Sequence, residues 1–104
     1  MSMSTISEAR EALVTQILDG DGRASRAQRR AAFDNVGLLA PLGTLIDKVV
    51  RQANQVTDQD IASARASGLT EDEIFELVIC GAVGEAVRQH TTALAALEAA
   101  TGRE

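Results

Sequence analysis

Few residues of this 104-residue chain have side chains suited to catalysis, and three of them fall on one predicted helix. Glu76 shares this helix with the single cysteine, Cys80, and the single histidine, His90. At the helical period, all three lie within about 40° of one line along the helix surface. A carboxylate and an imidazole are groups that general acid–base catalysis commonly uses, so Glu76 and His90 are the candidate catalytic residues.

Glu76 and His90 cannot touch within one straight helix, because the residues between them span about 21 Å at roughly 1.5 Å per residue. Across a symmetric interface, Glu76 of one protomer would face His90 of another. A buried carboxylate beside an imidazole would then suit acid–base chemistry on a small carbonyl or lactone substrate. The structural alternative is that Glu76 caps a helix or pairs with Arg51 or Arg88, while His90 lies at the surface or in an interface.

Three further residues are candidates for binding a substrate: Arg51, Arg88 and Cys80. Arg88 suits either a salt bridge between protomers or an anchor for a substrate carboxylate, and the sequence does not decide between them. Arg51 is a polar group next to an apolar helical stripe. Cys80 has apolar neighbours, which raise the pKa of a thiol, so a buried structural cysteine is the simpler interpretation.

A cluster of arginines starts the second predicted helix, and its role is undetermined. Its members are Arg23, Arg26, Arg29 and Arg30. Charge runs usually face solvent, so we expect these residues to form a solvated face that pairs with acidic neighbours. The alternative is a surface patch for an anion or a partner.

Composition excludes several classes of protein. The chain has 10 Lys+Arg against 15 Asp+Glu, a net charge of −5, and 2% aromatic residues. This acidity argues against nucleic-acid binding, and one cysteine excludes an intrachain disulfide. With one histidine, no metal site of several imidazoles can form within the chain. The sequence also has no cofactor-binding motif, so no cofactor is expected. There is no secretory leader pattern and no apolar run of membrane length, so we expect a cytoplasmic protein without membrane contact.

The patterning is helical throughout and predicts an all-α bundle of about five helices in a single domain, residues 1–104. Residues 1–40 supply two N-terminal helices, and residues 41–101 form the core. The expected helices cover residues 5–19, 26–35, 41–54, 58–67 and 71–101. Ser25, Thr57 and Thr70 are the expected N-caps.

The last predicted helix is too long for a compact domain of this size. About 30 residues at roughly 1.5 Å each span about 45 Å, whereas a 100-residue domain has a radius of gyration near 13 Å. Either the helix bends near Gly81 and Gly84, or its end projects and another chain covers it. Small residues there, Ala82 included, would let another helix approach closely. These features favour an oligomer.

Residues 56–98 resemble the core repeat of the carboxymuconolactone decarboxylase and alkylhydroperoxidase-D-like superfamily. The resemblance is carried by a short helix ending in Ala66-Ser-Gly-Leu-Thr70, an acidic capping box, and Ile74-Phe-Glu-Leu77 before an Ala/Gly-rich helix. It implies an all-α fold that assembles as trimers or hexamers. Redox members carry Cys-x-x-Cys followed by a histidine. Those positions fall at Ala53, Val56 and Asp60 here, so thiol-based peroxide reduction is not expected.

Three functions therefore remain open. The first is a divergent carboxymuconolactone decarboxylase-like protein without a redox thiol pair, which binds or transforms a small organic molecule at a helix interface. Whether it is an enzyme is uncertain; if it is one, non-redox acid–base chemistry is favoured. The second is a non-catalytic oligomeric interaction protein, and the third is a peroxidase acting through Cys80.

Overall fold

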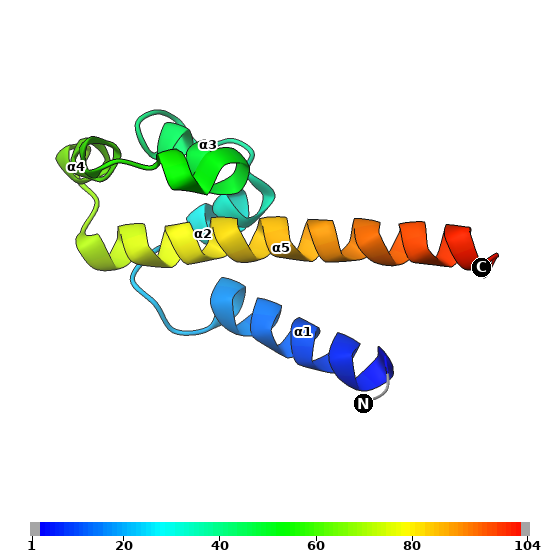
Figure 1. Cartoon of the computed structure of the whole chain (residues 1–104). Coiled ribbons are helices and arrows are strands. Elements are labelled where there is room, and N and C mark those ends of the chain that lie inside the picture. Colours follow the sequence, from blue (N-terminus) through cyan, green and yellow to red (C-terminus); the bar gives the residue numbers. More distant parts are fainter. Residues whose placement is uncertain (1–2, 103–104) are drawn as a thin grey trace.

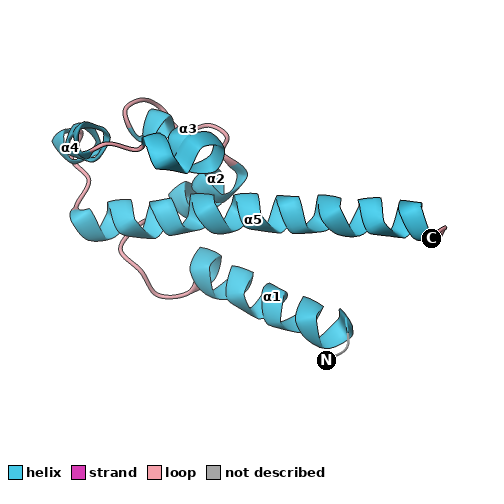
Figure 2. Ribbon diagram, in the orientation of Figure 1, coloured by secondary structure: helices cyan, strands magenta, loops and turns pink. Residues whose placement is uncertain are grey.

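The computed structural model describes residues 3–102, and within that range the chain is all-helical (Figures 1 and 2). This confirms the predicted all-α class. The five α-helices are α1 (Met3–Asp19), α2 (Arg26–Asp34), α3 (Leu42–Gln52), α4 (Asp58–Ala66) and α5 (Glu71–Thr101). A short 3-10 turn, Ala53–Gln55, follows α3. No helix of this part of the chain is both long and apolar enough to cross a bilayer.

The predicted starts of α2, α4 and α5 are confirmed by hydrogen bonds at their caps, whereas α1 begins at Met3, two residues before its predicted start. The Ser25 side chain accepts from the backbone N–H of Gln28 at the start of α2. Thr57 and Thr70 each open a helix with a complete capping box, closed by acidic side chains at the third helical position. The end of α2 was predicted one residue too late, because Asn35 adopts the left-handed conformation and terminates the helix at Asp34.

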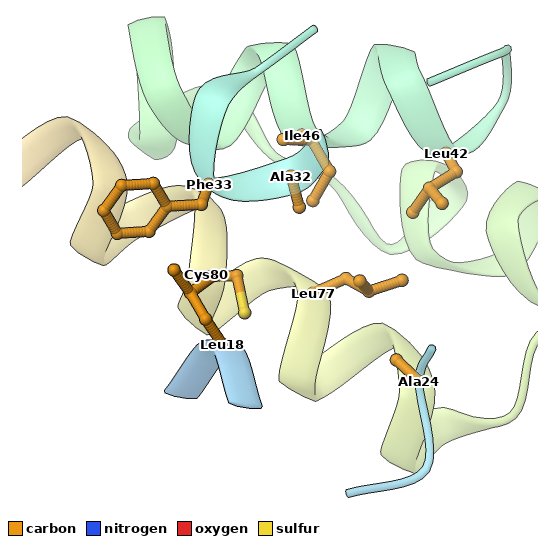
Figure 3. Close-up of a cluster of buried hydrophobic side chains, with 8 residues drawn as sticks. All are labelled: Leu18, Ala24, Ala32, Phe33, Leu42, Ile46, Leu77 and Cys80. Atoms are coloured by element: carbon orange, nitrogen blue, oxygen red, sulfur yellow. The ribbon is translucent and has the colours of Figure 1, made fainter. Parts of the chain in front are cut away.

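Helix α5 is the central element of the fold. Figure 1 shows α2, α3 and α4 on one side of α5 and α1 on the other. The main core lies where α1, α2 and α3 meet α5 (Figure 3), and its buried residues are Leu18, Ala24, Ala32, Phe33, Leu42, Ile46, Leu77 and Cys80. A second cluster, of Leu45, Ala64 and Ile74, packs α4 against α3 and α5.

The two glycines of α5 do not bend it, and the helix runs unbroken to Thr101. Instead they admit α2 and α3. A methyl group on Gly84 would overlap the backbone of Phe33, whereas one on Gly81 would meet a side-chain methyl of Ile46 at 3.2 Å. The close approach expected of these glycines is therefore made within the chain.

The C-terminal part of α5 projects from the other helices (Figure 1). The chain measures 51 × 28 × 22 Å and has a radius of gyration of 15.6 Å, above the roughly 13 Å of a compact domain of this length. In the apolar first half of α5, Phe75 is 66% exposed in the single chain. Of the two alternatives for the long helix, the structure shows the projecting end.

We predict that Gly84→Ala destabilises the protein by roughly 1–3 kcal/mol, because the added methyl group pushes α2 away from α5. Urea unfolding of the purified chain measures this loss. Gly81→Ala is the matched comparison: its methyl group meets a side-chain methyl of Ile46 rather than backbone, and alanine is the better helix former, so we expect a smaller loss. Equal free energies of unfolding for both variants would contradict this account of the α2–α5 contact.

Candidate functional site

Glu76 holds the connector between α1 and α2. Its Oε1 accepts the backbone N–H of Arg23 at 2.8 Å, and its Oε2 accepts those of Arg23 at 2.9 Å and Ala24 at 2.8 Å. Both residues precede the N-cap of α2. A methyl group at Gly22 would overlap Oε1 of Glu76, so a glycine is needed where the connector passes the carboxylate.

His90 lies at the surface, far along α5 from Glu76. Its Nδ1 is 3.1 Å from Nη1 of Arg10, on α1, and the same guanidinium nitrogen is 3.5 Å from the Thr91 hydroxyl. Glu76 and His90 thus have different partners on different segments, and the chain by itself does not bring them together. Their meeting across a protomer interface stays a prediction.

The two candidate substrate-binding arginines line the same cleft. It has a volume of about 640 Å³ and lies between the end of α2, the end of α3 and the middle of α5. Arg51 enters from α3 and Arg88 from α5. The other lining residues are mostly polar: Asp34, Asn35, Val36, Val50, Gln52, Glu85 and Gln89. The structure therefore brings together two residues that are 37 positions apart in the sequence.

Each arginine of this cleft is held by an acid on its own helix, and neither pairs with Glu76. Nε of Arg51 donates to Oδ1 of Asp47 at 2.7 Å, which raises the pKa of Arg51. A hydrogen bond from Asn35, together with Arg51, lowers the pKa of Asp47. Arg88 donates to Oε2 of Glu85 and, through Nη1, to the carbonyl of Phe33 at 2.6 Å. Arg88 thus caps the C-terminal end of α2.

Cys80 is buried, as predicted, with an exposed fraction of 1%. Figure 3 shows its side chain beside Leu18 of α1, and Sγ lies 3.6 Å from the carbonyl oxygen of Ile17. Burial raises the pKa of the thiol; Arg29 opposes this shift and the negative charge of Glu76 adds to it. A thiol with a raised pKa carries little thiolate at neutral pH, so this environment does not favour nucleophilic chemistry.

The arginine cluster does not form a single solvated face. Arg23, Arg26 and Arg30 are exposed, and Arg30 lies over the Phe33 ring at 5.9 Å. Arg29, however, is only 6% exposed, so the prediction of a solvated face was wrong at this position. The signal was present in the sequence, because Arg29 shares a helix face with Ala32 and Phe33 at the i+3 and i+4 spacing of a buried stripe.

Comparisons of this chain with protein-family models, with curated proteins and with solved structures find no match. Membership of the carboxymuconolactone decarboxylase superfamily therefore stays a prediction from residues 56–98.

We predict that Glu76→Gln destabilises the protein by about 1–3 kcal/mol, because an amide has one acceptor oxygen and places its NH₂ group against a backbone donor. Thermal or urea unfolding measures the loss, and faster hydrogen exchange at the amides of Arg23 and Ala24 locates it. Glu98→Gln, on the exposed end of α5, serves as the control. If Glu76→Gln left both amides protected and stability unchanged, Glu76 would not be the clamp of this connector.

Proposed function

We propose that this chain is a divergent carboxymuconolactone decarboxylase-like protein that binds a small organic molecule bearing carboxylate groups. The observation that supports this most is the cleft that Arg51 and Arg88 line together. Both residues are candidates on the sequence alone, and they reach the cleft from separate helices.

The guanidinium groups have capacity for a ligand. The bond from Arg51 to Asp47 uses Nε, which leaves the two Nη atoms on a side chain that is 70% exposed. Planar guanidinium groups bind carboxylates through paired hydrogen bonds. Val36 and Val50 add apolar surface for a short carbon skeleton, while Gln52 and Gln89 offer amide groups to a carbonyl or hydroxyl.

Binding is better supported than catalysis. The cleft is lined by neither Glu76 nor His90, so the proposed acid–base pair would need a second protomer to reach a ligand there. The peroxidase alternative depends on Cys80, whose burial and raised pKa weigh against it. An enzymatic role for Glu76 and His90 therefore rests on assembly, whereas a binding role for Arg51 and Arg88 does not.

The test is a titration of the purified protein with adipate, followed by NMR through the arginine Nε–H signals. We expect the signals of Arg51 and Arg88 to shift and saturate, and adipamide, which lacks the charges, to have no effect.

Arg51→Gln should weaken adipate binding roughly threefold to tenfold, since exposed charge-assisted hydrogen bonds are partly screened by solvent. Arg65→Gln is the matched control, because Arg65 is an exposed, salt-bridged arginine on α4. Equal responses to adipate and adipamide would contradict the proposal.

A second candidate function, a homo-oligomeric interaction protein, is supported by apolar side chains that the chain leaves exposed. Phe75 is 66% exposed and Leu97 is 60% exposed, both on α5. The projecting end of α5 offers further helix surface, and the family resemblance implies a trimer or hexamer. Apolar side chains left exposed on an extended helix are typical of a surface that another protomer covers. The two functions are compatible if the cleft stays open in the assembly.

We predict that Phe75→Glu lowers the molecular mass measured by light scattering after size-exclusion chromatography, because a carboxylate at the centre of an apolar contact is costly to desolvate. Leu39→Glu is the control, since Leu39 is 85% exposed in the connector before α3 and lies on no helix. A wild-type protein that runs as a monomer would contradict the oligomeric proposal, and equal masses for Phe75→Glu and wild type would remove Phe75 from the interface.

A further inference from the structure

A second, smaller cavity lies on the opposite side of α5, between the end of α1, the start of α2 and the first half of α5. Its volume is about 200 Å³, and its walls include Gln16, Ile17, Arg29, Glu76, Ile79 and Cys80. It is separate from the Arg51–Arg88 cleft and shares no lining residue with it.

Arg29 is the unusual member of this cavity, because its charge is buried without a carboxylate partner. Its hydrogen bonds both leave from Nη1, to the carbonyl oxygens of Gly20 at 2.7 Å and Ile17 at 3.4 Å. Nε is buried and has no hydrogen-bond partner in the described part of the chain. No salt bridge joins Arg29 to an acid of residues 3–102. A buried donor on a charged group is costly to leave unpaired.

Glu76 does not meet this need, although it lines the same cavity. Its two oxygens accept three hydrogen bonds from two backbone N–H groups, those of Arg23 and Ala24, which fixes the carboxylate toward the connector. The carbonyl groups at the end of α1 accept hydrogen bonds from Nη1 and so offset part of the positive charge of Arg29. Nε is closed off by packing, so Nη2, which makes no hydrogen bond among the described residues, is the donor left for a carboxylate oxygen.

We propose that this cavity binds a short-chain monocarboxylate, with Nη2 of Arg29 donating to one of its oxygens. The volume suits roughly six heavy atoms, taking about 30 Å³ for each as for liquid water. Ile17, Ile79 and Cys80 provide apolar walls for a short aliphatic tail. Glu76 and the exposed Asp21 also line the cavity, and their negative charges disfavour a dianion such as phosphate.

The experiment is an NMR titration of the full chain with sodium butyrate, read at the Arg29 Nε–H signal and at the Cys80 amide. We expect both signals to shift and saturate, with a dissociation constant of roughly 1 mM or below for so small a ligand. The Nε–H signals of Arg26 and Arg30 are internal controls. 1-Butanol tests the need for charge, and inorganic phosphate tests the preference for a monocarboxylate; neither should move Arg29 as butyrate does.

Arg29→Lys keeps the charge and removes Nη2, so it should weaken butyrate binding roughly tenfold. Arg30→Lys, at the exposed neighbour, should leave it unchanged. The titration of the wild-type protein decides the question even if Arg29→Lys fails to fold. A shift that does not saturate by about 20 mM, or an equal response to phosphate or 1-butanol, would overturn the proposal. This outcome is independent of the Arg51–Arg88 cleft, which adipate probes through different signals.

Discussion

The direct contact of α2 with α5 at Gly84 is the constraint on which the rest of the structure depends. Because Gly84 has no side chain, the backbone of Phe33 lies against α5. This approach places the Phe33 carbonyl within reach of Arg88, which caps α2 and lines the larger cleft at the end of α2. The same approach buries the Arg29 face of α2 beside Cys80. Both cavities lie beside this helix–helix contact.

Charged side chains, rather than apolar packing alone, position the N-terminal part of the chain. Glu76 holds the backbone before α2, and Arg29 binds the carbonyls that end α1. The two side chains join α1 to α2 beside the apolar contacts of Leu18 and Ala24, in a protein with two phenylalanines and no tyrosine or tryptophan. These hydrogen bonds to the backbone explain why Glu76 is half-buried and why both of its oxygens have partners.

The helices, their caps and the burial of Cys80 could be predicted from the sequence, because each depends on residues within one or two helical turns. The partners of Glu76 could not be predicted, because it accepts from backbone N–H groups 53 and 52 positions away. The sequence does not indicate which backbone donors a side chain will meet. Gly81 and Gly84 were correctly associated with a close helix contact, but the partner inside the chain was not foreseen. Arg29 was predicted to be exposed because it is charged, although it lies on the apolar face of α2. The meeting of Arg51 and Arg88 depends on how α3 and α5 pack, which periodicity does not encode.

We propose that the cleft between α2, α3 and α5 binds a small carboxylate. A crystal structure of the protein grown with adipate tests this most directly, because it shows the ligand and the assembled protomers together. We predict one adipate carboxylate between the guanidinium groups of Arg51 and Arg88, with the cleft open to solvent. Adipate bound elsewhere, or a cleft filled by side chains of a neighbouring protomer, would contradict it.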